Sequence, residues 1–430
     1  MKLKSVIRSR IIQWLTSQSR QRLVRNRVEL LRRISGRPHE LIYFHRADDP
    51  YCQLMVQLLP ELMTRFYIQI KPVVVERLPA DMYPDPQRYE AYTILDAIRQ
   101  AKLYGLGFPA RAIVPDVLSA RMANNFLADR QDDPNFFSLA EDVGAALWQR
   151  DVVGLQAICG DALIEHSDVL RTNENLLWRL GHYASANIYY GEEFYAGTDR
   201  LDHLEARLNK LGLGDNERHY DLGRVWIDDV VDNPFDASDQ TIEIFHSVRS
   251  PYSYLALEQC AYLRNKTGVN VVIKPVLPMV KRGMKVPPSK IRYIISDTAH
   301  EAYESNIPFG RMADPLASAE QGLAIGHWAK TLGRDMNFYR SFGQAHFAKG
   351  IDGSQTDGMI SILEMAKLSV KTGMKAIHDQ SWRGEVEANK QEMLRHGCWG
   401  VPTLKCGDQV VWGQDRMHTI VESLKNGEGR

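Results

Sequence analysis

Ser250-Pro251-Tyr252-Ser253 lies between a short apolar run, residues 241–245, and a stretch whose apolar residues recur at helical spacing. A strand that passes through a loop into a helix brings the loop's backbone N–H groups to the helix N-terminus. We expect Ser250 to cap that helix and Pro251 to fill its first position, where a missing N–H costs nothing. The partial positive charge of a helix N-terminus stabilises an anion such as a thiolate or carboxylate. The stretch therefore predicts a strand, an anion-stabilising loop and a helix, in that order.

Two motifs in a fixed order connect this stretch with a known family. They are Phe245-His-Ser-Val-Arg-Ser250-Pro-Tyr-Ser-Tyr-Leu255 and, downstream, Gly400-Val401-Pro402-Thr403 with Trp412-Gly413-Gln414-Asp415-Arg416. Residues 240–425 thereby resemble the kappa-class glutathione transferases and the 2-hydroxychromene-2-carboxylate isomerases, which belong to the DsbA-like branch of the thioredoxin fold. The resemblance implies an α/β domain with a long helical insertion at about 288–395. It also implies glutathione as a bound thiol co-substrate.

The resemblance implies a role for each matching residue. Ser250 matches the serine that binds the glutathione sulfur, where a hydrogen-bond donor favours the thiolate of a thiol that is otherwise mostly protonated at neutral pH. Val401 and Pro402 match a main-chain clamp with a cis peptide bond, which would pair with the extended glutathione backbone. Gln414 and Asp415 match the pair that holds the γ-glutamyl end, with Asp415 accepting from its ammonium group.

Three positions near the predicted site depart from the family pattern, and the first is Ser247, where the family favours aspartate. Lys285 stands where the family usually has asparagine, and a lysine can bind a carboxylate but cannot accept a hydrogen bond. Arg249 stands where the family favours an apolar residue, and it would add a cation beside the sulfur. The secondary candidates are Tyr252, Ser253, Tyr293 and Trp412. A structural role is the alternative for each of them, and a plain helix cap is the alternative for Ser250, which the paired motif disfavours.

An internal repeat divides the chain. Residues 39–45 match 240–246, and residues 179–201 align without gaps on 395–417. In the same alignment Tyr92 and Asp96 fall on Tyr293 and Asp297, and Ile70-Lys71-Pro72-Val73 falls on Ile273-Lys274-Pro275-Val276. The sequence therefore predicts two tandem thioredoxin-like (DsbA-type) domains, each with a central mixed sheet and a long helical insertion.

The first repeat has lost the residues that would do chemistry. Asp49 occupies the position of Ser250, and Ala186 occupies the position of Pro402. Cys52 stands alone at the position of the resolving cysteine of a thioredoxin, where it could form a mixed disulfide or simply be buried. Neither loop has a cysteine at its first position, which excludes thiol–disulfide exchange through a C-x-x-C pair. We expect this first site to be degenerate.

Basic residues dominate the start of the chain. Residues 1–35 carry ten Lys or Arg residues against one acid, Glu29, and apolar residues recur at helical spacing on both sides of a polar break at 16–19. This pattern predicts a basic amphipathic helical arm. The arm could pack on its own protein or a dimer partner, or attach to an anionic membrane surface or nucleic acid. The predicted ranges are 1–38 for the arm, 39–225 for the degenerate domain, 226–239 for a linker and 240–430 for the second domain.

Composition narrows the protein class. The chain of 430 residues has 53 basic and 53 acidic residues, so no overall charge favours nucleic acid, and we expect no specific binding to it. Five cysteines without C-x-x-C spacing fit a reducing compartment, and we expect a cytoplasmic protein. No apolar run approaches the length of a transmembrane helix. No metal-binding spacing is present, and a homodimer is left open.

The resemblance implies a glutathione-dependent isomerase or transferase that acts on a small unsaturated electrophile. Glutathione thiolate would add to the unsaturated carbon; the isomerase then rotates a single bond and releases glutathione, whereas the transferase stops at the adduct. The alternative is a thioredoxin-fold binding or scaffold protein without catalysis. It is supported by the degenerate first repeat, by the basic helical arm and by the departures at Ser247, Arg249 and Lys285. A disulfide oxidoreductase fits the fold, but the missing cysteines argue against it.

Overall fold

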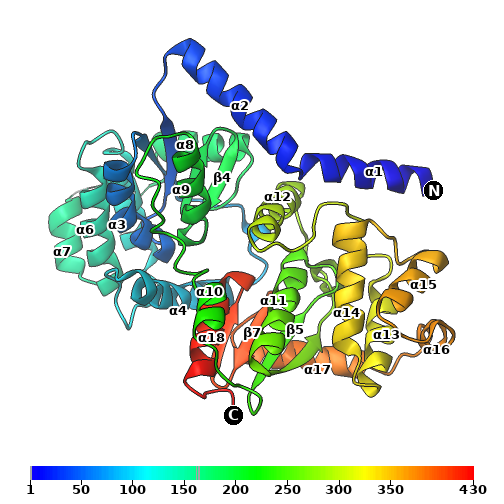
Figure 1. Cartoon of the computed structure of the whole chain (residues 1–430). Coiled ribbons are helices and arrows are strands. Elements are labelled where there is room, and N and C mark those ends of the chain that lie inside the picture. The colour runs from blue at the N-terminus through cyan, green and yellow to red at the C-terminus, as the bar shows by residue number, and fades with distance from the viewer. Residues whose placement is uncertain (1, 161, 163–164) are drawn as a thin grey trace. The chain divides into compact units, whose positions relative to one another are not determined.

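The computed structural model describes residues 2–160, 162 and 165–430 (Figure 1). Met1, where the predicted arm begins, lies outside the described residues. The chain divides into two compact units, which we call the smaller unit (residues 24–222) and the larger unit (residues 1–23 with 223–430). Each is described by itself.

Each unit is built on a four-stranded mixed sheet. The smaller unit has strands β1 (Glu40–His45), β2 (Gln69–Val74), β3 (Asn187–Tyr190) and β4 (Glu193–Ala196), in the order β2-β1-β3-β4. The larger unit has β5 (Thr241–His246), β6 (Asn270–Pro275), β7 (Thr403–Cys406) and β8 (Gln409–Trp412), in the order β6-β5-β7-β8. In both sheets the first two strands are parallel and the remaining pairs are antiparallel. The two sheets therefore share one topology.

The hydrogen-bond register corrects one detail of the predicted repeat. Ile70 pairs with Leu41, and at the equivalent position of the larger unit Val271 pairs with Ile242. The structural counterpart of Ile70 is thus Val271, and the alignment of 70–73 with 273–276 was wrong by two residues. A shift of two residues keeps every side chain on the same face of a strand, so the apolar pattern could not reveal it.

Helices fill the remainder of both units. Those that begin before the larger unit's sheet are α1 (Lys2–Leu15), α2 (Gln18–Ser35), α3 (Pro50–Arg65), α4 (Pro86–Tyr104), α5 (Val117–Ala128), α6 (Phe136–Gln149), α7 (Val152–Cys159), α8 (Asp168–Leu180), α9 (Leu201–Lys210) and α10 (Trp226–Asp232). The later ones are α11 (Pro251–Thr267), α12 (Pro288–Glu304), α13 (Ala319–Thr331), α14 (Asp335–Gln344), α15 (Thr356–Met365), α16 (Val370–Ala376), α17 (Trp382–Arg395) and α18 (Met417–Lys425). Short single turns occur at Ala80–Met82, Thr198–Arg200, Met279–Arg282, Ala345–Lys349 and Gln414–Arg416.

Two segments differ from what their sequence patterns predict. Apolar residues recur at helical spacing over 357–372, but this stretch forms two helices, because Lys367 adopts φ 54° after α15 and Ser369 caps α16 with its side chain. The predicted linker at 226–239 contains α10, whose Trp226 and Val230 are buried in the larger unit's core. Burial of an apolar face makes a helix of a segment whose acidic residues suggested a loop.

The core of the larger unit lies between its sheet and the helical insertion. Ile242 and Ile244 of β5 pack with Leu257 of α11 and with Phe338 and Phe342 of α14, all of them fully or almost fully buried. β5, α11 and α14 lie side by side in Figure 1. This packing fixes the start of α11 at the end of β5, where the predicted site lies.

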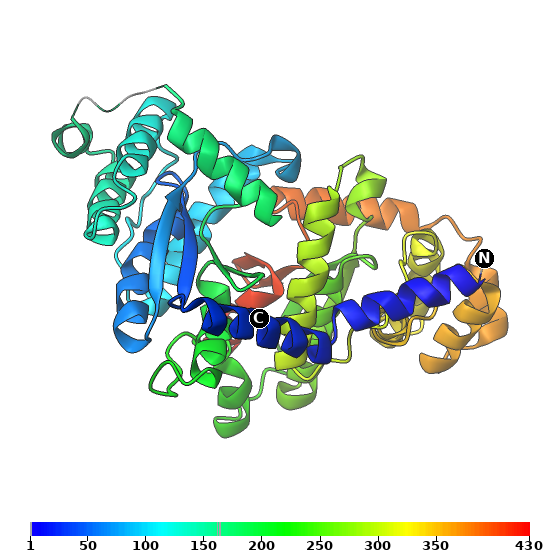
Figure 2. The same cartoon turned by 90° about the horizontal axis from the view of Figure 1, so that it is seen from above.

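The arm consists of two helices, and some of their described side chains contact the rest of the chain. Ile12 of α1 contacts a cluster formed by Tyr254, Met312 and Phe347 of the larger unit, and Figure 2 shows α1 beside helices of the insertion. In the smaller unit, Arg25 of α2 makes two hydrogen bonds, of 2.8 and 2.6 Å, to Glu193 on the edge strand β4. The outward face of α2 keeps Leu30, Leu31 and Ile34 exposed. No helix among the described residues is both long and apolar enough to cross a membrane.

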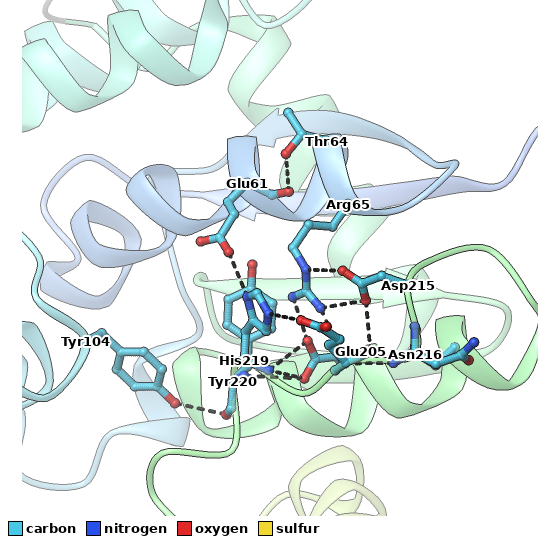
Figure 3. A network of polar contacts seen from close by, with 11 residues as sticks. Glu61, Thr64, Arg65, Tyr104, Glu205, Asp215, Asn216, His219 and Tyr220 are labelled. Atoms are coloured by element: carbon cyan, nitrogen blue, oxygen red, sulfur yellow. Dashed lines mark hydrogen bonds and ion pairs between the residues drawn. The ribbon is translucent and has the colours of Figure 1, made fainter.

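A polar network holds the loop that follows α9 in the smaller unit (Figure 3). Arg65 donates to the buried Glu205 at 2.7 Å and makes two hydrogen bonds of 3.0 Å to Asp215. Glu205 also accepts the backbone N–H groups of His219 and Tyr220. Asp215, Glu217 and His219 could gather metal ligands within 4.8 Å, but all three are exposed and Arg65 already binds Asp215, so we assign no metal to them.

Replacing Arg65 by alanine should loosen this loop. Glu205 would keep its two backbone donors but lose its cation, which we expect to cost about 2 kcal/mol because a buried carboxylate is left without a counter-charge. Hydrogen exchange at the amides of His219 and Tyr220 should then accelerate about 30-fold. Arg88→Ala removes an exposed ion pair with Asp85 and serves as the control, with no expected change. Unchanged exchange in Arg65→Ala would contradict the role of the network.

Candidate functional site

Ser250 caps α11 at the end of the loop that leaves β5. Its Oγ accepts the N–H of Ser253 at 3.1 Å, and Pro251 takes the first helical position. α11 is 17 residues long, so its N-terminus carries the full partial charge of a helix end. The serine hydroxyl is half-buried and has one proton to donate. The predicted cap is therefore present, and it leaves the hydroxyl at the positive end of the helix.

The predicted clamp lies directly beside this cap. The Val401–Pro402 peptide bond is cis, as the resemblance implied. The Ser250 hydroxyl donates to the backbone carbonyl of Val401 at 3.4 Å. Gly400 permits the close approach of the Trp412 ring to the clamp backbone, because a Cβ at this position would lie 2.4 Å from that ring. The structure thus brings Ser250, Val401, Pro402 and Trp412 together, from elements about 150 residues apart in the chain.

Ser253 and His246 form the buried side of the loop. Ser253 is fully buried, and its Oγ accepts the N–H of Ser247 at 3.4 Å. This contact holds the corner between β5 and α11, and it gives Ser253 a structural role. Burial lowers the pKa of His246 to about 4, so the imidazole is neutral at pH 7. Its ring packs against Tyr339, with ring centroids 5.4 Å apart.

Gln414 belongs to a buried network that the sequence did not predict. Its Nε2 donates to Glu301 Oε2 at 3.1 Å and also contacts Asp415, and its side chain is buried. Glu301, on α12, is buried as well and receives a 2.6 Å hydrogen bond from Arg224. The only sequence signal was the position of Glu301, four residues after Asp297 on one face of a helix. Arg224 gave no signal, because it lies in an irregular segment far along the chain.

The secondary candidates lie around this centre with different surroundings. Arg249 makes hydrogen bonds of 3.0 and 3.2 Å to Asp314, so its charge is largely compensated, and the sequence missed this partner. The Tyr252 hydroxyl donates to Asp297 at 2.6 Å. Lys285 is exposed, and Tyr293 is half-buried on α12. The ligand-binding roles of Lys285 and Tyr293 stay predictions.

The smaller unit repeats this geometry with other residues. Asp49 caps α3, and its carboxylate accepts the Ser185 hydroxyl at 2.5 Å, where the larger unit has Ser250 beside Val401. Ala186 follows with φ 52° instead of a proline. Burial and the nearby Asp49 raise the pKa of the Cys52 thiol far above its usual range, and its sulfur accepts the N–H of Arg46 at 3.2 Å. A buried, protonated thiol in this position is a packing group.

A known protein family matches most of the larger unit. The family described as DSBA-like thioredoxin domain matches residues 241–425. Residues 241–425 form a DSBA-like thioredoxin domain. A second family, described as F plasmid transfer operon protein, matches residues 14–95.

Individual relatives match the DSBA-like domain over almost their whole length. A 2-hydroxychromene-2-carboxylate isomerase of Sphingobium xenophagum is 23% identical over 194 residues, which cover 43% of this chain and 98% of that protein. A solved 2-hydroxychromene-2-carboxylate isomerase is 16% identical, with a TM-score of 0.39 over 43% of this chain and 95% of that one. The cytosolic disulfide reductase DsbM of Pseudomonas aeruginosa is 17% identical, with a TM-score of 0.30 over 40% and 87%.

Proposed function

We propose that the DSBA-like domain binds glutathione and uses its thiolate to isomerise or conjugate a small unsaturated electrophile. The observation that carries this proposal is the Ser250 hydroxyl, held at the N-terminus of α11 beside the cis Val401–Pro402 bond. The sequence similarity to a 2-hydroxychromene-2-carboxylate isomerase supports the same reaction class. We place this reaction in the cytoplasm, which fits five free and buried thiols.

Ser250 is suited to bind a sulfur anion. Its hydroxyl proton now points to the Val401 carbonyl over a long 3.4 Å contact, so it can turn to a better acceptor at little cost. A thiolate in that place would gain this hydrogen bond and the helix charge together. The freed Val401 carbonyl and its neighbouring N–H could then pair with the peptide backbone of glutathione.

The chemistry requires only a positioned thiolate. The sulfur would add to an unsaturated carbon of the electrophile and move an electron pair onto the conjugated carbonyl. In an isomerisation, a single bond rotates in this adduct, the electron pair returns, and glutathione leaves unchanged. In a conjugation, a proton neutralises the adduct, which is released. The domain supplies thiolate stabilisation and alignment in both cases.

A catalytically inactive binding protein is the second candidate. It is favoured by Arg249, whose charge Asp314 compensates, and by Gln414, whose amide is already engaged by Glu301. Such a protein would bind glutathione without converting any electrophile. A disulfide oxidoreductase, the activity named for DsbM, would need a reactive thiol in the active loop, and that loop holds Ser250 and Ser253 instead.

Ser250→Ala should bind glutathione but no longer lower the pKa of its thiol. Loss of one hydrogen bond to an anion should raise that pKa by about 1 to 2 units relative to the wild-type complex. Calorimetry would measure binding, and thiolate absorbance as a function of pH would measure the pKa. Ser369→Ala is the matched control, because Ser369 caps α16 through the same kind of hydrogen bond outside the site. It should lose about 1 kcal/mol of stability and leave the thiol pKa unchanged.

The outcomes separate the candidates. A lowered thiol pKa that depends on Ser250 supports thiolate chemistry, and turnover of α,β-unsaturated ketones by the wild type would establish it. Binding with a normal thiol pKa and no turnover would favour the inactive binding protein. Failure of the wild type to bind millimolar glutathione would refute the proposal.

A further inference from the structure

Arg282 is a half-buried cation whose guanidinium the protein leaves partly unpaired. It ends the short turn Met279–Arg282, which follows β6. Its NH1 donates to the backbone carbonyl of Trp399 at 3.0 Å. Its Nε and NH2 are buried, and among the described residues they have no hydrogen-bond acceptor. Burial also lowers the pKa of this guanidinium to about 10.

An unpaired buried guanidinium is unfavourable for folding alone. Burying a charge is costly unless a counter-charge and hydrogen bonds compensate it. The neighbouring cations follow this rule, since Arg249 binds Asp314 and Lys281 binds Glu320 at 2.6 Å. For Arg282, no carboxylate among the described residues lies within ion-pair distance. The stability of the fold therefore gives no reason for an arginine at this position.

The smaller unit shows that the same backbone contact can be made without a charge. Tyr183 occupies the position of Trp399, and its carbonyl accepts the Tyr83 hydroxyl at 3.4 Å. The position of Arg282 itself is taken there by an exposed residue of opposite charge, Asp81. A neutral phenol thus holds the carbonyl in the unit that has lost the serine and the proline. The cation occurs only in the unit that kept them.

The Arg282 guanidinium contacts the loop that forms the clamp. Trp399 precedes Val401 by two residues, and the Val401 carbonyl accepts the Ser250 hydroxyl. The indole Nε1 of Trp399 is also buried without an acceptor among the described residues. Two nitrogens of a guanidinium form a planar fork, which matches the two oxygens of a carboxylate. The chemistry on this side of the clamp is that of an anion receptor.

We propose that Arg282 binds a carboxylate of the ligand that occupies the Ser250–Val401 site. This inference rests on the proposed function of that site for its location, but not for its chemistry. The carboxylate could come from glutathione itself or from the second substrate, and either would supply the acceptors for Nε and NH2. The sequence did not indicate this residue, because a single arginine in a turn is unremarkable until its unpaired, buried nitrogens are known.

Arg282→Gln and Arg282→Lys test the proposal on the full chain. Calorimetry would compare glutathione, its glycine ethyl ester, benzoate and benzamide as probes. We expect Arg282→Gln to weaken the carboxylate-bearing probe that uses the subsite by about 10- to 100-fold, with a smaller loss in Arg282→Lys. Lys281→Gln is the control, because it removes the same charge from the adjacent, paired residue. Removal of an uncompensated buried charge should leave the melting temperature of Arg282→Gln unchanged or raised.

The probes distinguish the two sources. If glutathione loses affinity in Arg282→Gln while its ester binds both proteins equally, the carboxylate belongs to glutathione. If benzoate, but not benzamide, loses affinity, it belongs to the second substrate. Benzoate binding that depends on Arg282, in a protein that ignores glutathione, would support the subsite and refute the proposed function. Equal binding of all probes to wild type and Arg282→Gln, or no binding at all, would overturn the subsite, as would a lowered melting temperature with unchanged affinities.

Discussion

Replacing Arg224 by alanine is expected to lower the free energy of unfolding of the larger unit by about 3–5 kcal/mol. Arg224 donates to Glu301 over 2.6 Å, and the Glu301 side chain is only 1% exposed. Its loss leaves a buried carboxylate with a weaker, neutral donor in Gln414 at 3.1 Å. The cost is large because a charge that has lost its counter-charge stays desolvated. Urea unfolding followed by tryptophan fluorescence and hydrogen exchange in α12 would measure it.

Two variants make this prediction specific. Arg224→Ala combined with Glu301→Gln should recover a substantial part of the loss, because the buried charge is then gone as well. Arg430→Ala is the control, since Arg430 pairs with Asp239 where both side chains are more than half exposed. It should change stability by less than about 1 kcal/mol. Equal effects of Arg224→Ala and Arg430→Ala would show that the buried network contributes little. Glutathione affinity should fall with Arg224→Ala alone, because Gln414 loses its orientation.

Lowering the pH from 7 to 4 should destabilise the larger unit through two buried histidines. Burial lowers the pKa of His246 and of His346 to about 4, from an ordinary value of 6.5. Between these values the unfolded chain binds a proton and the folded one does not, so stability is complete above pH 6.5 and falls as the pH decreases toward 4. Each shift corresponds to about 3 kcal/mol. Denaturant unfolding at several pH values would measure the slope.

The contacts of His346 give this effect a structural cause. Its Nδ1 lies 2.9 Å from the Phe342 carbonyl and must donate, so Nε2 is the acceptor for the N–H of Gly353 at 3.2 Å. Protonation of Nε2 removes that acceptor. His346→Gln should flatten the pH dependence between 4 and 6.5 and lower stability at pH 7. His378→Gln, at an exposed position, is the control and should keep the wild-type profile. An unchanged profile in both His346→Gln and His246→Leu would contradict the assignment.

The sequence predicted the start of the DSBA-like domain because it depends on local signals. A short apolar run predicted β5, and Ser250-Pro251 predicted the cap of α11. The family motif, rather than any property of the dipeptide, predicted the cis bond at Pro402. The register of β2 and β6 was misjudged because identical letters, displaced by two residues, fit the same face of the sheet.

The sequence could not show the other contacts of the site, because they join residues that are far apart along the chain. Three contacts join a predicted site residue or its partner to residues between 65 and 113 positions away, namely Arg249 with Asp314, Arg224 with Glu301 and Gln414 with Glu301. No periodicity encodes such pairs. The sequence indicates the unpaired nitrogens of Arg282 even less, because they depend on the fold placing no hydrogen-bond acceptor near them. Burial and partner are properties of the packed chain.

A tyrosine–aspartate hydrogen bond occurs in both units, and it helps to distinguish structural residues from those of the proposed site. Tyr51 donates to Asp96 at 2.7 Å in the smaller unit, as Tyr252 donates to Asp297 at 2.6 Å in the larger one. The smaller unit keeps this pair although it lacks the serine and the proline, so the pair is maintained for architecture. The two units of this chain can therefore be compared with each other, position by position. Features that occur in both units belong to the scaffold. Ser250, Pro402 and Arg282 occur at their positions in the larger unit only, and the two proposals rest on them.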